Sequence, residues 1–123
     1  MKFSESTETY LKEIFRISQT ADCVRSIDVA NKLGVTKASV NRAVKKLSKE
    51  GYLKHVPYGL IFLTDTGSKK AQELCSKQEL ITKYLMKTLF LEKTTAFKEA
   101  CKIEHVIGQI TINKIKEVFE FDD

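Results

Sequence analysis

Apolar residues recur at helical spacing in two short runs between residues 26 and 51, and a single glycine separates the runs. In the first run they lie three residues apart, at Ile27, Ala30 and Leu33. Ser26 is a favourable N-cap before this run, and Gly34 suits the left-handed conformation in which many helices end. The pattern therefore predicts a short helix that begins after Ser26 and ends before Gly34.

A second run follows Thr36, whose hydroxyl can cap a helix. Its apolar residues lie at i, i+4 and i+7, namely Val40, Val44 and Leu47, and Gly51 ends it. Two helices joined by about four residues around a glycine are typical of the helix-turn-helix. We therefore expect the second helix to enter the major groove of DNA, and the rest of the chain to position it, pair it with a second copy or switch it.

The segments on either side of this pair predict a winged helix. A helical pattern over residues 4–20 precedes it. After Gly51 the period changes, and two β-prone runs, 52–56 and 60–64, flank the turn Pro57-Tyr58-Gly59. Two strands directly after a recognition helix are expected to form a two-stranded wing whose tip lies near the DNA backbone. The alternative is an ordinary hairpin that only closes the core.

The remaining residues predict helices over 66–89, 95–107 and 110–121. Three apolar helices in roughly fifty residues cannot bury all of their faces alone, so we expect a homodimer. The predicted fold is mainly α. It combines a winged helix-turn-helix DNA-binding domain over residues 1–70 with a helical dimerisation domain over residues 71–123.

The positive charge is concentrated on the predicted recognition helix and the residues after it. The chain has 21 Lys and Arg and 16 Asp and Glu, a net charge of +5. Residues 36–55 contain six basic residues and one acid, which is also +5, so the other residues balance at 15 against 15. A phosphate-binding face requires this concentration, although a solvated lysine-rich helix would look the same. With the helix-turn-helix pattern, the charge favours double-stranded DNA as the partner over a winged helix that contacts only proteins.

The face of the second helix opposite its apolar stripe carries the candidate DNA contacts. Asn41 suits adenine, Arg42 suits guanine, and Ala38 can touch a thymine methyl group. The alternative for each is a phosphate contact, equally favoured for Arg42 and more favoured for the lysines that follow. The predicted contacts are Thr36, Lys37, Ala38, Ser39, Asn41, Arg42, Lys45 and Lys46, with Tyr58 at the wing tip.

Composition argues against several other classes of protein. No stretch approaches the roughly 20 apolar residues of a membrane span, and the start of the chain has no signal-peptide core, so a cytoplasmic location is expected. The three cysteines are odd in number and lack CxxC spacing, which argues against a disulfide framework. There is no Ser-His-Asp set and no phosphate-cradling glycine loop, so an enzyme is not expected.

Five segments of the chain, in order, are E-x-Y-L-K-E-I-F, V-R-S-I-D-V-A-N-K-L-G-V-T-K-A-S-V, L-x-x-E-G-Y-L, P-Y-G-L-I-F-L-T-D-T-G and E-A-C-K-I-E-H-V-I. Together they resemble the diphtheria-toxin-repressor family of metal-dependent transcription factors, which includes iron and manganese regulators. The resemblance covers nearly the whole chain. It implies a winged-helix domain, a helical dimerisation and metal-binding domain, and a homodimeric repressor on a palindromic operator. Some members add a C-terminal SH3-like domain, for which this chain is expected to be too short.

Three candidate metal ligands, Cys101, Glu104 and His105, lie at i, i+3 and i+4 and would share one helix face. Thiolate, carboxylate and imidazole together can hold a divalent transition ion. By themselves such residues are more often incidental. The resemblance favours a metal site, because these positions match the family's A-C-x-x-E-H ligand motif. The family implies Fe²⁺ or Mn²⁺, and the thiolate favours Fe²⁺, Zn²⁺ or Co²⁺ over Mn²⁺.

Other ligand positions of the family are altered in this chain. Thr9 stands where relatives have Met or Asp, and Gln78 stands where they have His. Phe97 replaces a second-site His, and Lys12 replaces the Glu of manganese-type members. We therefore expect one site with three strong ligands, joined by the Gln78 amide oxygen or the Thr9 hydroxyl, and no second site.

Two hypotheses about regulation follow from the resemblance. In the first, metal ties the first helix to the dimerisation helices and favours the state with the two recognition helices about 34 Å apart. In the second, metal control is lost, because the Lys12 ammonium near Glu104 takes the place of a cation. A winged-helix module for protein contacts alone is the remaining alternative.

Overall fold

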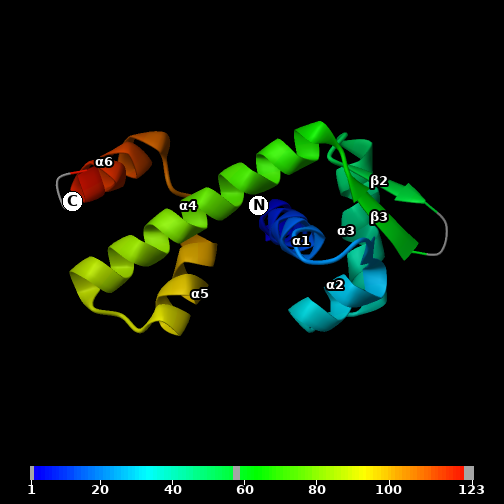
Figure 1. Cartoon of the computed structure of the whole chain (residues 1–123), viewed down its shortest axis with the longest axis horizontal. Coiled ribbons are helices and arrows are strands. Elements are labelled where there is room, and N and C mark those ends of the chain that lie inside the picture. Colours follow the sequence, from blue (N-terminus) through cyan, green and yellow to red (C-terminus); the bar gives the residue numbers. More distant parts are fainter. Residues whose placement is uncertain (1, 57–58, 121–123) are drawn as a thin grey trace. The chain divides into compact units, whose positions relative to one another are not determined.

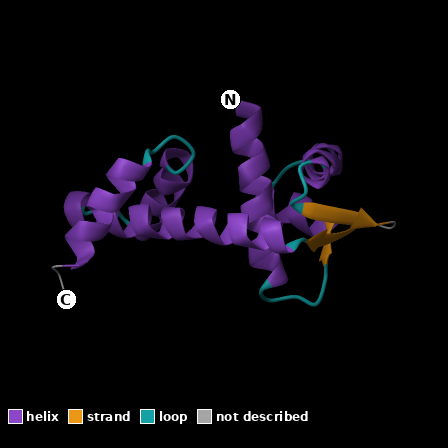
Figure 2. Ribbon diagram, turned by 90° about the horizontal axis from the view of Figure 1, so that it is seen from above, coloured by secondary structure: helices purple, strands orange, loops and turns teal. Residues whose placement is uncertain are grey.

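The computed structural model describes residues 2–56 and 59–120 and divides into two compact units, residues 1–73 and 74–123 (Figure 1). The elements in chain order are α1 (Lys2–Ser18), β1 (Val24–Arg25), α2 (Ser26–Leu33), α3 (Lys37–Lys49), β2 (Leu53–Val56), β3 (Leu60–Leu63), α4 (Asp65–Leu89), α5 (Lys93–Ile103) and α6 (Gln109–Glu120). The fold is mainly α, as predicted, with a small antiparallel sheet drawn in orange in Figure 2. Among the described residues, no helix has both the length and the apolar character that crossing a membrane demands.

The first helix of the predicted helix-turn-helix, α2, begins one residue earlier than expected. Its N-cap is Arg25, whose backbone N–H donates a hydrogen bond to the Asp28 carboxylate at 3.2 Å. Ser26 was predicted as the cap and is instead a buried residue of the first turn. The cause is tertiary, because Arg25 pairs with Leu60 in the sheet and this pairing keeps the chain extended up to Arg25.

The buried face of α2 also differs from the predicted one. Its buried residues are Ser26, Val29 and Ala30, whereas Ile27 is 47% exposed. The predicted stripe was therefore wrong at Ile27. Eight residues offer two overlapping apolar faces, and contacts with α1 and α3 decide between them.

The second helix, α3, agrees with its prediction. Thr36 is the N-cap, and its hydroxyl accepts a hydrogen bond from the backbone N–H of Ser39 at 3.1 Å. The buried face consists of the three predicted residues and one more, namely Val40, Ala43, Val44 and Leu47. This apolar face contacts α1 and α2, so the opposite face of α3 is left to the solvent.

The sheet has one strand more than predicted, and its order is β1-β3-β2. β2 and β3 form the expected hairpin, with Leu53 opposite Leu63. β1 lies between the first predicted helix and the helix-turn-helix, where the sequence pattern predicted no strand, and it pairs Val24 with Ile61. Two residues give no periodic signal, which is why the sequence did not reveal β1. Tyr58, expected at the wing tip, lies outside the described residues.

The second unit is built from three helices around a shared apolar core of Ile81, Leu85, Ala96, Ala100 and Ile112. α5 ends at Ile103, although the pattern predicted helix as far as residue 107. The backbone N–H groups of Val106 and Ile107 both donate to the Ile103 carbonyl, so the chain tightens into a turn before Gly108. Glu104 and His105 therefore lie just beyond the helix rather than inside it.

Candidate DNA-binding face and metal centre

The exposed side of α3 carries most of the residues that were predicted to contact DNA. Ser39 and Lys46 are half-buried, and the exposed ones are Thr36, Lys37, Ala38, Asn41, Arg42 and Lys45. This division follows from the buried face of Val40, Ala43, Val44 and Leu47, because the residues on the opposite side of the helix point outward. We define the α3 face as these eight predicted residues.

Polar side chains in the first turn of α3 are joined to one another. The Thr36 hydroxyl donates a hydrogen bond to the Ser39 hydroxyl at 3.0 Å. The Nη2 atom of Arg42 donates to the same Ser39 oxygen at 3.2 Å. The guanidinium of Arg42 is thus held at the N-terminal end of α3, which is the end that reaches base edges in a helix-turn-helix.

The α3 face is also strongly basic. Lys37, Arg42 and Lys45 are exposed, and Lys49 continues the exposed lysines to the end of the helix. The first turn of α3 has no acidic residue, so nothing there repels a phosphate. Exposed cations beside a helix N-terminus suit the phosphate backbone of a duplex. The α3 face can therefore supply both phosphate contacts and contacts to base edges.

The wing of the first unit also carries exposed polar and aromatic side chains. Lys54 and His55 on β2 are exposed, and Lys54 pairs with the exposed Phe62 on β3. Leu53 and Ile61 are buried. The hairpin therefore closes the core with one face while its other face carries a cation and an aromatic ring.

Four of the five predicted metal ligands, all except Thr9, lie in the second unit. Thr9 lies on α1 in the first unit and is half-buried. Cys101 is a half-buried residue in the last turn of α5. Glu104 follows as the C-cap residue with helical φ and ψ of −63° and −21°, and its N–H donates to the Ala100 carbonyl. The i, i+3 relation between Cys101 and Glu104 therefore survives although α5 ends before Glu104.

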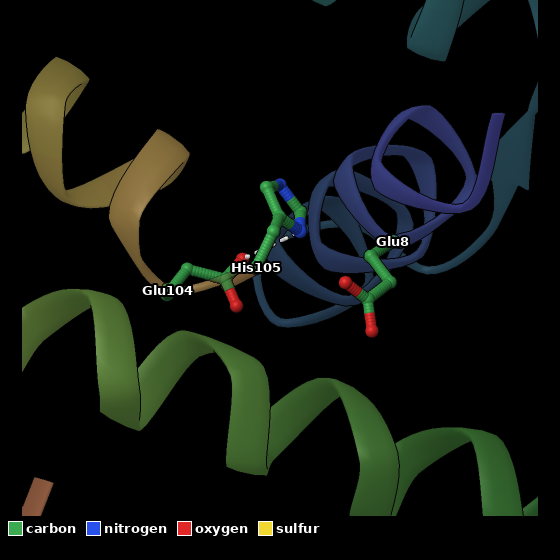
Figure 3. A group of neighbouring side chains, drawn as sticks. All are labelled: Glu8, Glu104 and His105. Atoms are coloured by element: carbon green, nitrogen blue, oxygen red, sulfur yellow. Dashed lines mark ion pairs between the residues drawn. The ribbon is translucent and has the colours of Figure 1, made fainter. Parts of the chain in front are cut away.

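Glu104 and His105 form a buried acid–imidazole pair. The Glu104 Oε1 and His105 Nδ1 atoms are 3.5 Å apart, and the side chains are 0% and 4% exposed, respectively (Figure 3). Burying a carboxylate is costly unless positive charge or hydrogen bonds offset the loss of water. A buried carboxylate next to an imidazole, one turn after a thiol, suits a divalent transition ion. Glu104 and His105 are donors of the kind that the predicted metal requires, and in the part of the chain that the structure describes Cys101 is not in the group of converging ligand atoms that contains them.

Gln78 is connected to the helix that bears the thiol. It is buried on α4, and its amide Nε2 donates to the backbone carbonyl of Phe97 at 3.1 Å. Phe97 lies one turn before Cys101 on α5. Because the amide nitrogen is directed at α5, the oxygen is the atom of this side chain that could serve as a ligand.

Sequence reasoning passed over Glu8, a half-buried carboxylate on α1 that Figure 3 also labels. Glu8 lies one turn before Lys12, which is fully buried, so the two charges share one helix face. The available signal was the i, i+4 spacing within E-x-Y-L-K.

Comparison with known proteins accounts for both halves of the chain. Residues 2–60 match the family model "Iron dependent repressor, N-terminal DNA binding domain", and residues 64–123 match "Iron dependent repressor, metal binding and dimerisation domain". Together these two models cover nearly the whole sequence, as the five motifs suggested.

Individual relatives agree with these family models. The "Uncharacterized HTH-type transcriptional regulator MJ0568" of Methanocaldococcus jannaschii is 31% identical over 118 residues, which are 95% of this chain and 94% of that protein. The "HTH-type transcriptional regulator MntR" of Shouchella clausii is 31% identical over 116 residues, 94% of this chain and 80% of that protein.

Solved structures share the fold. The "manganese regulator SloR" superposes with a TM-score of 0.83 at 26% identity, over 94% of this chain and 54% of that one. This chain thus spans about half the length of SloR and of the solved manganese-dependent transcriptional repressor that it also matches. The family consists of transcriptional regulators rather than enzymes, and its members bind operator DNA through the N-terminal domain and dimerise through the C-terminal domain. The chain belongs to the iron-dependent repressor family of divalent-metal-dependent, DNA-binding transcriptional regulators.

Proposed function

We propose that this regulator binds a palindromic operator as a homodimeric repressor in the cytoplasm, with the α3 face in the major groove. The observation that carries the proposal is the exposed, basic side of α3, where Arg42 donates a hydrogen bond to the hydroxyl of Ser39 in the first turn. Asn41 and Arg42 are assigned to base edges, and Lys45 and Lys46 to phosphates. We place the border between the DNA-binding and dimerisation domains at residues 70 and 71, close to where the chain divides into two compact units.

DNA binding is tested with the full chain and a library of randomised duplexes, with and without added divalent metal. We expect enrichment of a two-fold symmetric sequence, and affinity that falls as salt concentration rises. Binding without sequence preference would contradict the assignment of base contacts. Absence of any duplex binding would instead favour a winged helix used for protein contacts.

We propose further that one divalent metal ion is held by Cys101, Glu104 and His105, with the Gln78 amide oxygen or the Thr9 hydroxyl completing the set. The ion supplies a compact positive charge with directed coordination. The buried Glu104 carboxylate offsets that charge, and the carbonyl of Phe97 orients the Gln78 amide. A thiolate among the ligands favours Fe²⁺, Zn²⁺ or Co²⁺ over Mn²⁺. In this respect we expect the chain to differ from its structural relative SloR, which is named as a manganese regulator.

The metal proposal is tested by calorimetric titration of the reduced, metal-free protein with each of these ions. We expect one ion per chain, with Mn²⁺ the weakest of the four. Dissociation constants in the millimolar range for all four ions would reject a metal-responsive site. Two ions per chain would contradict the single-site assignment.

A second candidate function rests on the complete burial of Lys12 on α1. In this version the Lys12 ammonium takes the place of a bound cation, and the regulator no longer needs metal. Equal operator affinity with and without a chelator would support it. A large loss of affinity in chelator would reject it, and the Lys12→Gln variant separates the two versions because only the second version requires the ammonium.

A further inference from the structure

Three polar side chains at intervals of three residues form a connected line in the first turns of α3. The backbone N–H of Ser39 donates to the Thr36 hydroxyl oxygen at 3.1 Å, and the Thr36 hydroxyl donates to the Ser39 hydroxyl oxygen at 3.0 Å. Arg42 completes the line by donating from Nη2 to the same Ser39 oxygen at 3.2 Å. One serine hydroxyl therefore joins the helix cap to an exposed guanidinium.

Arg42 depends on this serine more than on any other side chain. In the part of the chain that the structure describes, Ser39 is the only residue whose side chain accepts a hydrogen bond from Arg42. Thr36 in turn fixes the Ser39 hydroxyl, because the capping hydrogen bond ties Thr36 to the helix backbone. A long, exposed side chain with many rotamers is thereby given one preferred direction.

We propose that Ser39 is a positioning residue that directs Arg42 toward a guanine, and so sets guanine preference at one position of each half-site. This inference rests on the proposed DNA-binding function of the α3 face. A guanidinium has five N–H donors, and a bidentate contact to guanine O6 and N7 uses two of them. The hydrogen bond to Ser39 occupies one donor and leaves four for the base.

Without the Ser39 hydroxyl, Arg42 keeps its charge but loses its preferred direction. Phosphate oxygens line both sides of the major groove and accept hydrogen bonds from arginine in many orientations. The side chain then gains access to phosphates as alternatives to the base. Loss of the Ser39 hydroxyl should therefore reduce sequence preference more than total affinity. If Ser39 only stabilised the helix, its loss would weaken binding to all duplexes alike.

The experiment compares Ser39→Ala with the unaltered chain in selection from a randomised duplex library, using full-length protein. Ser48→Ala is the matched control, because Ser48 lies on the same helix and its buried hydroxyl has no hydrogen-bond partner among the described residues. Ser39→Thr retains a hydroxyl and tests rescue. Arg42→Ala shows which selected position depends on the guanidinium.

We expect Ser39→Ala to lose the guanine at the position that Arg42→Ala identifies, and to lose about two- to tenfold in affinity for the selected duplex. Affinity for random duplex should fall less than affinity for the selected duplex, and circular dichroism should show the helical content of the unaltered chain. Ser48→Ala and Ser39→Thr should keep the guanine. In the double variant, Ser39→Ala should add nothing to Arg42→Ala, because both changes break one interaction.

Ser39→Ala with an unchanged sequence preference would overturn the inference while leaving the proposed function intact. An equal loss of affinity for selected and random duplexes would overturn it as well, since that is the pattern of a simple phosphate contact. If Arg42→Ala leaves every selected position unchanged, both the base assignment of Arg42 and this inference fail. No enrichment by the unaltered chain would overturn the proposed function and the inference together.

Discussion

The two units of this protein differ in how directly local sequence specifies their working residues. In the first unit, the α3 face lies on one regular helix with a threonine cap, an apolar stripe and basic residues between. In the second, the metal-ligand candidates come from α4, from the last turn of α5 and from the turn that follows it. Within a single helix, the spacing of residues in the sequence decides which of them share a face. A site built from several elements forms only once those elements pack together. DNA binding is thus a local property, and metal binding is a property of the tertiary fold.

Glycine substitutions give the largest expected contrast between the units. A Cβ atom at Gly67 would overlap the backbone carbonyl of Tyr52, whereas one at Gly108 meets nothing within 4 Å. Gly67→Ala should therefore lower the free energy of unfolding by at least about 3 kcal/mol, because a backbone carbonyl cannot move aside as a flexible side chain does. Gly108→Ala should change it little. Thermal melting followed by circular dichroism measures both, and similar melting temperatures for the two variants would contradict the close approach of α4 to Tyr52.

Replacing the buried acid of the second unit should have the next largest effect, on metal binding. Glu104→Gln keeps the size of the side chain and removes its charge, so metal affinity should fall by about 100-fold or more, roughly 2.8 kcal/mol. Glu99→Gln is the control, because it makes the same change at an exposed acid of α5. The Glu99 Oε2 atom lies 3.8 Å from the Lys102 Nζ atom. Calorimetric titration measures the difference. Equal metal affinity in the two variants would remove Glu104 from the ligand set.

The helix cap of the first unit should contribute a smaller amount to stability. Thr36→Ala leaves the Ser39 N–H without its capping oxygen and should cost about 1 kcal/mol. Thr88→Ala in the second unit removes a hydroxyl that bonds the Tyr84 carbonyl of its own helix at 2.7 Å, and it should be close to neutral. Urea unfolding curves of both variants test the comparison. A larger loss of unfolding free energy for Thr88→Ala than for Thr36→Ala would contradict the prediction that the capping hydroxyl contributes more to stability.

Single lysines should produce the smallest effects, visible mainly in salt dependence. Lys45→Ala removes one proposed phosphate contact, so the slope of log affinity against log salt should become shallower by about 1. Lys114→Ala removes another exposed lysine, on α6, whose Nζ atom lies 3.7 Å from the Glu117 Oε1 atom, and should leave the slope unchanged. Fluorescence titration of a random duplex at several salt concentrations measures both. A change of slope for Lys114→Ala alone would move the DNA contacts away from α3.

The apolar surface of the second unit is consistent with dimerisation in this family. Leu89, Phe90, Val106 and Ile110 are exposed, and Phe90 is 87% exposed with a φ of 57°, which is uncommon for a residue other than glycine. The three helices bury one shared core and leave these side chains outside it. The sequence predicted a homodimer from the number of apolar helix faces in the second unit, and not from the position of any one of these exposed residues.

The sequence alone determined the helix-turn-helix, the position of the Thr36 cap, the basic side of α3 and the order of the helices. These features are local, because the 3.6-residue period and capping chemistry act within a few residues. The sequence did not determine the N-cap of α2, which the pairing of Arg25 with Leu60 sets from more than thirty positions away. It did not determine the buried face of α2 either, because contacts with α1 and α3 decide it. It did not reveal β1, which becomes a strand only by pairing with β3. Nor did it show that α5 ends before Glu104, or that the Gln78 amide is held by the Phe97 carbonyl. Contacts between residues distant in the chain decided each of these, and periodicity carries no information about them.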